Sequence, residues 1–397
     1  MNIKNFKSVI SPLRETEGGL WGRRALWVVV LGLVIAIAAT VAEMVRLRYA
    51  NYLVYTDSTV DFWNGVNPYT QQFVDDHGRY FLYTPVFSVL YWPIAMLPHW
   101  LGPLVWNIGN FALFTLAVFT LPRRYDAHKV QIYLFLLLVL EQSVFSFQFN
   151  VVVAYIFLFA YSLLERGHGL WAVLLIMLSA TTKVYGIVEL LLLFCYPKAF
   201  RNLCAAAVMG VLLLMLPALK VGVDGLLPCY MNWWAMLSQH QSSATYVSLL
   251  YAWPLRLVLD HYRIVQLITI GIVVAVFFVR WRRWGDFSFR ATTLGVLMGW
   301  IIVMGDSSET HTYLIALAGY MLWYWLRERH TVMDRVLLWA MVVLFGCVPV
   351  DVLVPTSVHN FINGKLMLDV YVYAVVWCQM LWSMATDHQP LIDVSGN

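Results

Sequence analysis

Charged residues are scarce in this sequence. Asp, Glu, Lys and Arg make up only 12% of the 397 residues, whereas hydrophobic residues make up 61%. A water-soluble domain carries about 25% charged residues, so this chain has too few of them to cover a soluble surface. Lipid must therefore replace water around much of the chain. The formal net charge of +4 is small, and we expect no nucleic-acid partner.

Cysteine is also scarce, and its spacing is uninformative. None of the five cysteines pairs with another at metal-ligand spacing, and only Cys229 lies in an expected loop. Core and lipid-facing positions are ordinary places for cysteine. We therefore expect no disulfide framework, no metal site and no cofactor.

Long apolar runs, in contrast, are abundant, as at 25–41, 132–140 and 267–279. Only helices and closed barrels satisfy their backbone groups in lipid. Barrel strands alternate apolar and polar residues, and these runs do not alternate. The sequence therefore predicts an all-α polytopic membrane protein with about nine to thirteen transmembrane helices.

Two apolar segments do not fit simple crossings. Residues 84–98 carry prolines at both ends and predict a partial insertion or a surface helix. The stretch 170–196 is too short for two crossings of about 20 residues each. It predicts either two half-helices or one tilted helix with Lys183 near its middle.

The chain shows no internal repeat, low-complexity tract or separate soluble domain. We predict one integral-membrane domain over 1–397, with a cytoplasmic arm at 1–24 and a short disordered tail at 387–397. The apolar run after the arm is too long for a cleaved signal peptide, and no small-residue cleavage site follows it. We expect it to be an uncleaved first span.

Basic residues predict the orientation of the chain. Most of them fall in six clusters, which the positive-inside rule assigns to the cytoplasm. The segments between the clusters then face outward, and they contain most of the uncommon polar groups. We therefore expect an active site on the periplasmic face of a bacterial inner membrane. The outward segments are about 47–83, 148–150, 183–186, 221–262, 306–311 and 351–365.

The first outward segment, 47–83, is long, aromatic and acidic. Residues 65–69 read as a turn. The stretch 55–62 has helical spacing, so we expect a short helix along the interface on which Asp57 and Asp61 share a face. The closeness of two carboxylates, or of lipid, can raise a carboxylate pKa toward the range that suits a general base. A solvated acidic loop is the alternative.

This segment resembles the first outer loop of family 87 glycosyltransferases, which are integral-membrane enzymes of the GT-C class. The resemblance lies in a Gly-x-Asn-Pro-Tyr turn, a Tyr-x-Pro-x-Phe element and a later proline-flanked stretch. The matching residues are Gly65, Asn67, Pro68, Tyr69, Tyr83, Pro85, Phe87, Pro93, Leu97 and Pro98. The aspartate of the family pattern falls on Asn51, which is followed by Tyr55. Because an amide cannot accept a proton as a base, Asp57, Asp61 or the later Glu309 must take that role.

Two further motifs resemble the same family. Residues 147–150, Phe-Gln-Phe-Asn, are similar to its Gly-Gln-x-Asn, with Phe147 in place of the glycine. Gln148 and Asn150 could bind a sugar or a phosphate, although helix capping and interhelical hydrogen bonding are the ordinary roles of such a pair. Residues 307–313, which include Glu309 and His311 beside Asp306, resemble a late histidine-containing segment.

Lys183 occupies the place of a lysine in the family pattern. An isolated lysine at membrane depth is costly and is by default a functional hypothesis. It would neutralise the phosphate of a lipid-linked donor. Alternatively, it pairs structurally with Glu189 or Glu141.

The resemblance implies a GT-C-like helical bundle with an extended catalytic first outer loop. It implies transfer of mannose, or of another hexose or pentose, from a polyprenyl-phosphate sugar donor to a glycan or glycolipid acceptor. We expect the transfer to be inverting and metal-independent, with Asp57 or Asp61 as the base and Lys183 on the phosphate. The other expected substrate contacts are Asn51, Tyr55, Tyr83, Gln148, Asn150 and His311.

Two other classes of membrane protein compete with this interpretation. A transporter or lipid flippase would also place charges within helices, but many carry internal repeats, which this sequence lacks. An oligosaccharide polymerase or ligase tends to carry its large outer loop late in the chain. Here the longest outward segments are the first one and 221–262.

Overall fold

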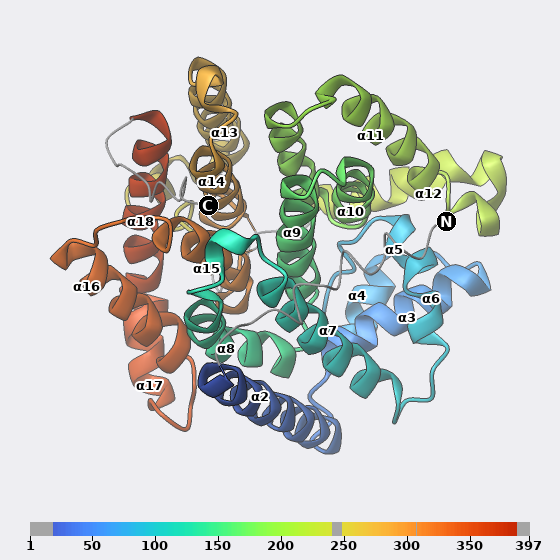
Figure 1. Ribbon diagram of the computed structural model, residues 1–397. Coiled ribbons are helices and arrows are strands. Elements are labelled where there is room, and N and C mark those ends of the chain that lie inside the picture. Colours follow the sequence, from blue (N-terminus) through green and yellow to red (C-terminus); the bar gives the residue numbers. More distant parts are fainter. Residues whose placement is uncertain (1–18, 240–247, 307, 387–397) are drawn as a thin grey trace. The chain divides into compact units, whose positions relative to one another are not determined.

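The computed structural model describes residues 19–239, 248–306 and 308–386, and all regular secondary structure in these ranges is helical (Figure 1). The predicted all-α membrane class is confirmed. Most of the predicted arm at 1–24 and the whole tail at 387–397 lie outside the described residues.

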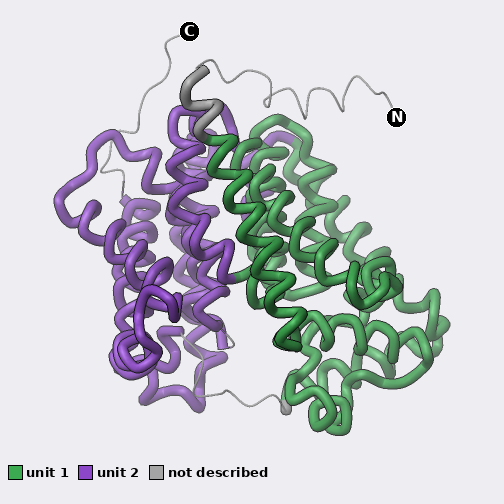
Figure 2. The backbone as a smooth tube through the Cα atoms, turned by 90° about the horizontal axis from the view of Figure 1, so that it is seen from below, with its two compact units in different colours: residues 1–120, 143–190, 198–241 green, residues 121–142, 191–197, 242–397 purple. Residues whose placement is uncertain are grey.

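The chain divides into two compact units, coloured separately in Figure 2. Unit 1 is formed within residues 1–120, 143–190 and 198–241, and unit 2 within 121–142, 191–197 and 242–397. The single integral-membrane domain expected from the sequence stays a prediction.

Unit 1 consists of long and short helices. Its helices are α2 (Gly19–Val45), α3 (Ala50–Asn64), α4 (Gln71–His77), α5 (Pro85–Leu90), α6 (Trp92–Ala95), α7 (Gly102–Phe119), α9 (Asn150–Glu165), α10 (Gly169–Thr182), α11 (Ala199–Leu214) and α12 (Ala218–Gln239). Helix α7 packs against α2 and α9, and α10 packs against α9 and α11. The buried Asn107 amide donates to Thr40 Oγ1 at 2.9 Å and links α7 to α2. Such interhelical polar contacts are typical of helices that associate in lipid.

Unit 2 has its core where α14, α15 and α18 pack together. Its helical segments are η2 (Arg123–Tyr125), most of α8 (Lys129–Phe145), η4 (Leu255–His261), α13 (Tyr262–Val279), η5 (Trp281–Arg283), α14 (Phe287–Val303), η6 (Thr310–Thr312), α15 (Tyr313–Tyr324), α16 (Val332–Met341), η7 (Val342–Cys347), α17 (Thr356–His359), η8 (Asn360–Lys365) and α18 (Leu368–Ala385). Helices α14 and α15 approach closely where Gly295 meets Gly319. Trp377 of α18 donates to the Val296 carbonyl of α14 at 3.0 Å.

Four helical stretches in the described residues are long and apolar enough to cross a membrane, or five if one bent pair forms a single span. They are Ala25–Val45, Gly102–Phe119, Leu255–Val279 and Leu368–Ala385, and the pair Ala199–Leu214 and Ala218–Ser238 is bent by 98°. Four shorter apolar helices, at 150–165, 169–182, 184–195 and 287–303, accompany them. The expected nine to thirteen transmembrane helices therefore stay a prediction.

The two atypical segments have clear structures. Residues 84–98 form the short helices α5 and α6, and their expected partial insertion or surface position stays a prediction. Residues 170–196 form two helical segments, because α10 ends at Thr182 and η3 (Val184–Cys195) begins after a break at Lys183. The interpretation as two half-helices is the one that the structure supports.

Candidate functional site

The first predicted outer loop folds as two helices joined by a turn. Helix α3 ends at Gly65, whose φ of +82° lies in the left-handed region that glycine adopts without strain. Asn67 Oδ1 accepts the Tyr69 backbone N–H at 3.0 Å and closes the turn. Thr70 then caps α4 by accepting the Phe73 N–H at 3.2 Å. The predicted turn at 65–69 is confirmed.

Helix α3 carries its predicted site residues on two different faces. Successive residues of an α-helix are rotated by about 100°, so Asn51 and Tyr55 lie roughly 40° apart around the axis. By the same geometry Asp57 lies about 160° from Tyr55, on the opposite face. Asn51 and Tyr55 therefore belong to one cluster of side chains, and Asp57 and its neighbours belong to another.

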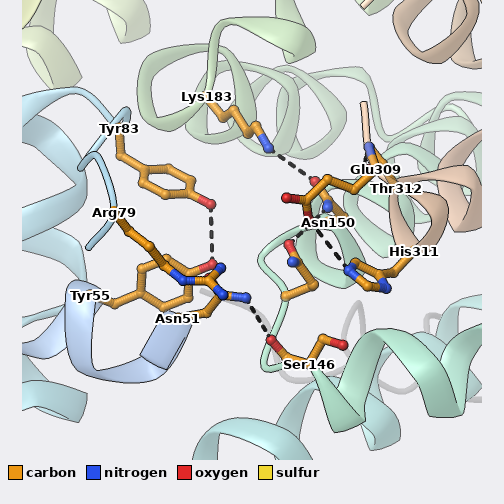
Figure 3. Close-up of polar contacts among 11 residues, drawn as sticks. Asn51, Tyr55, Arg79, Tyr83, Ser146, Asn150, Lys183, Glu309, His311 and Thr312 are labelled. Carbon is orange, nitrogen blue, oxygen red and sulfur yellow. Dashed lines mark hydrogen bonds and ion pairs between the residues drawn. The ribbon is translucent and has the colours of Figure 1, made fainter. Parts of the chain in front are cut away.

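The first cluster joins Tyr55 to Lys183 through Tyr83 (Figure 3). The hydroxyls of Tyr55 and Tyr83 are hydrogen-bonded at 3.2 Å, and their rings meet edge to face with centroids 5.4 Å apart. The Lys183 ammonium lies 5.6 Å from the Tyr83 ring centroid and 4.8 Å from that of Tyr185. Aromatic faces attract cations at such distances.

Lys183 stands at a break in a helix. Its backbone is extended, with φ −138° and ψ 112°, between the end of α10 and the start of η3. Thr84, at the N-terminus of α5, donates through its backbone N–H to the Thr182 carbonyl at 3.3 Å and through its hydroxyl to the Thr181 carbonyl. These bonds satisfy carbonyls that the end of α10 leaves without helical partners. They also fix Tyr83, the residue before Thr84, beside Lys183.

Two amides orient the lysine. Lys183 Nζ donates to Asn150 Oδ1 at 3.0 Å (Figure 3). Asn150 Nδ2 in turn donates to Gln148 Oε1 at 3.0 Å. The structural alternative, an ion pair with Glu189, is wrong: both buried carboxylate oxygens of Glu189 lack a hydrogen-bond partner among the described residues. The carboxylate oxygens of Glu141 likewise accept no hydrogen bond there.

The loop before α9 has a strained residue. Phe147 has a φ of +53°, in the left-handed region that favours glycine. Its fully buried ring contacts those of Tyr49 and Tyr52, with centroids 6.1 and 6.2 Å away. The glycine of the resembled motif is thus explained by backbone conformation, and here aromatic packing holds the same conformation with a phenylalanine.

Asn51 connects this loop to the first one. Its Nδ2 donates to the Ser146 carbonyl at 2.8 Å, and its Oδ1 accepts from Arg79 at 2.8 Å. An ionised aspartate has no proton to donate to the carbonyl, so it could make only one of these two bonds. An asparagine rather than an aspartate at position 51 is therefore explained by these two hydrogen bonds.

The second face of α3 holds an acidic cluster that includes a histidine. Asp57 Oδ2 lies 3.0 Å from His77 Nε2, and His77 Nδ1 lies 2.9 Å from the Phe73 carbonyl. Each ring nitrogen of His77 thus lies within hydrogen-bond distance of an oxygen atom, which fixes the imidazole between α3 and its own helix. Sequence analysis missed His77 because twenty residues separate it from Asp57; its place at the end of the short helix α4 was the available signal.

Asp61 lies one turn after Asp57 and has a raised pKa. Partial burial is the largest cause, and the negative charge of Asp57 raises the pKa further, whereas His77 lowers it. Asp76 contributes a smaller increase in the pKa. Within the described residues, neither this cluster nor any other group of His, Cys, Asp or Glu has the arrangement of a metal site.

Glu309 and His311 belong to unit 2, whereas the other predicted site residues belong to unit 1. Glu309 caps η6, where its side chain accepts the Thr312 N–H and its own N–H donates to Thr312 Oγ1 at 3.0 Å. His311 Nε2 lies 3.4 Å from Glu309 Oε2. Ser307, from the same motif, lies outside the described residues.

In a comparison with known protein families, residues 81–304 match the model described as glycosyltransferase family 87. No curated protein matches the chain. The matched region is more than half of the sequence and contains Tyr83, Gln148, Asn150 and Lys183. The α3 carboxylates lie before it, and Glu309 lies after it.

Proposed function

This chain belongs to glycosyltransferase family 87, and we propose that it transfers a sugar from a polyprenyl-phosphate donor to a hydroxyl group of a glycan or glycolipid. The proposed transfer inverts the anomeric centre and takes place on the periplasmic face of a bacterial inner membrane. Mannose is the first sugar to test among hexoses and pentoses. The single observation that carries the proposal is the environment of Lys183.

Lys183 has the properties of a residue that binds a lipid-borne phosphate. It interrupts an apolar helical stretch, where a cation is costly unless it serves a ligand or a partner. The Asn150 amide that accepts its hydrogen bond is neutral, so this bond orients the ammonium without cancelling its charge. Tyr83 and Tyr185 flank it with aromatic faces. A phosphate leaving group would gain a charge-assisted hydrogen bond there.

The general base belongs on the other side of the sugar. In an inverting transfer the acceptor oxygen attacks the anomeric carbon opposite the leaving phosphate, so its base is not expected to touch Lys183. The new C–O bond forms as the C–O bond to phosphate breaks. The acceptor proton passes to a carboxylate, and the electron pair leaves on polyprenyl phosphate, which Lys183 stabilises.

We propose Asp61 as this base, ahead of Asp57 and Glu309. A base works best when its pKa approaches the operating pH, and burial and the charge of Asp57 raise the pKa of Asp61. Asp57 already has one oxygen bound to His77, which orients it and occupies one of its two proton-accepting atoms. The sequence alone left both aspartates as candidates.

Donor binding tests the proposal directly. We predict that Lys183→Met weakens binding of a polyprenyl-phosphate sugar by about ten- to a thousandfold, by analogy with truncating one partner of a buried charge pair. Lys220→Met is the matched control, because Lys220 is an exposed lysine of α12 in the same unit. Equal donor affinity of the Lys183→Met variant and the wild type would remove Lys183 from the site and the proposal with it.

A further inference from the structure

Arg79 has an unusual environment for a cation in an acidic loop. Its side chain is exposed, and its NH1 donates to Asn51 Oδ1 at 2.8 Å (Figure 3). Across the described part of the chain, Arg79 forms no ion pair with a carboxylate and no further hydrogen bond. The guanidinium is thus held in place by a neutral group.

Carboxylates close to it in sequence have other roles. Asp75, four residues before Arg79, accepts a hydrogen bond from Gln71 at 2.8 Å. Asp57 is bound to His77, and His77 is two residues before Arg79 in the sequence. Asp76, three residues away, forms no ion pair with it in the described residues. An ion pair between a surface arginine and a carboxylate contributes a small favourable free energy. The orientation of Arg79 toward an amide instead therefore calls for a separate reason.

Asn51 provides the link to the proposed donor site. It lies one helical turn before Tyr55, whose hydroxyl bonds to that of Tyr83, and the Tyr83 ring lies beside Lys183. Its Nδ2 also binds the Ser146 carbonyl, in the loop that leads to Gln148 and Asn150. Through Asn51, the exposed Arg79 is therefore attached to two elements that carry the residues around Lys183: helix α3 and the loop before α9.

We propose that Arg79, oriented by Asn51, is a second anion-binding residue of this site and binds a lipid-borne phosphate. A guanidinium presents a planar fork of donors that matches phosphate oxygens, and an amide leaves its full positive charge for the ligand. Asparagine at position 51 then has a second role, because an aspartate there would neutralise Arg79. This inference rests on the proposed function only in placing Lys183 on the donor.

Two sources of such a phosphate are distinguishable: the polyprenyl phosphate of the donor and the headgroup of an anionic phospholipid. The full chain in phosphatidylcholine nanodiscs is titrated separately with polyprenyl monophosphate and with phosphatidylglycerol. The variants are Arg79→Gln, Asn51→Asp and Asn51→Ala. Arg48→Gln is the control, since Arg48 is an exposed arginine just before α3.

We expect Arg79→Gln to weaken binding of one of the two lipids about tenfold, the loss typical of one charge-assisted hydrogen bond. Asn51→Asp should weaken it more than Asn51→Ala. Both substitutions remove the bond to Ser146, but only the aspartate places a negative charge beside Arg79. Loss confined to polyprenyl phosphate identifies the donor as the ligand, and loss confined to phosphatidylglycerol identifies a phospholipid headgroup.

Unchanged affinity of Arg79→Gln for both lipids would overturn the inference, as would an equal loss in Arg48→Gln. An equal effect of Asn51→Asp and Asn51→Ala would also contradict the inference. It would show that Asn51 acts only through its hydrogen bond to the Ser146 carbonyl and not through Arg79. If the wild type binds no polyprenyl phosphate, the proposed function fails. The phosphatidylglycerol titration still decides whether Arg79 binds an anion.

Discussion

At the scale of single residues, two asparagines have the same task. Asn51 donates to the Ser146 carbonyl and accepts from Arg79, and Asn150 donates to Gln148 and accepts from Lys183. A primary amide carries a donor and an acceptor on one planar group without a net charge. Each asparagine therefore holds a cation on one side and a loop on the other, and leaves the cation charged.

The base assignment gives a prediction at this scale. Asp61→Asn should lower turnover by about a hundred- to ten-thousandfold while donor binding is kept, the usual cost of losing a general base. A base must be deprotonated, so activity falls as the pH drops through its pKa. Because the charge of Asp57 raises the pKa of Asp61, Asp57→Asn should lower that pKa and move the acidic limb of the pH–rate profile to lower pH.

The control for this prediction is Asp76→Asn. Asp76 is the weakest of the four causes acting on the pKa of Asp61, so its removal should move the acidic limb in the same direction by less. If Asp61→Asn and Asp57→Asn both keep near-full turnover while Glu309→Gln is inactive, the base lies in the late segment of unit 2. The first loop would then serve as a substrate lid.

At the scale of elements, sequence patterns predicted what depends on neighbouring residues. Helical spacing and the Gly65–Tyr69 signal predicted α3 and its turn. The short length of 170–196 left two outcomes, and one of them, the pair of half-helices, includes the break seen at Lys183. The pairing of His77 with Asp57 was not predictable in this way, because it depends on how α4 folds back onto α3. The sequence pattern also did not reveal that the acidic residues of α3 lie on a different face of the helix from Asn51 and Tyr55.

Close helix packing gives a prediction for unit 2. A Cβ atom added at Gly295 in α14 would lie 2.8 Å from the carbonyl oxygen of Gly319 in α15. The two helices would then have to move apart. Gly295→Ala should therefore lower the free energy of unfolding by about 1–3 kcal/mol, as overpacking does. Gly271→Ala in α13 is the control, because nothing lies within 4 Å of its added Cβ.

Thermal unfolding of the purified full chain in detergent measures both variants. Gly271→Ala should keep or raise the apparent Tm, since alanine favours helix over glycine. A Gly295→Ala variant as stable as Gly271→Ala would show that α14 and α15 are not held at the distance seen between Gly295 and Gly319.

At the scale of the whole molecule, composition alone predicted the fold class. A chain with 12% charged residues and long apolar runs has few alternatives to helices in lipid. The number of crossings was harder to predict, because several apolar helices are shorter than the about 20 residues that a full span needs. Helix α14 has 17 residues and α10 has 14. Length and hydropathy do not decide whether such helices cross completely.

The central claim is that a sugar leaves a polyprenyl-phosphate donor, and labelled transfer measures it most directly. The full chain in liposomes is supplied with a membrane lipid extract and with a panel of radiolabelled polyprenyl-phosphate sugars, or with the corresponding nucleotide sugars. We predict that label passes from at least one polyprenyl-phosphate sugar to a product in the extract, and from no nucleotide sugar. Transfer from a nucleotide sugar, or none from any lipid-phosphate sugar across the panel, would contradict the account.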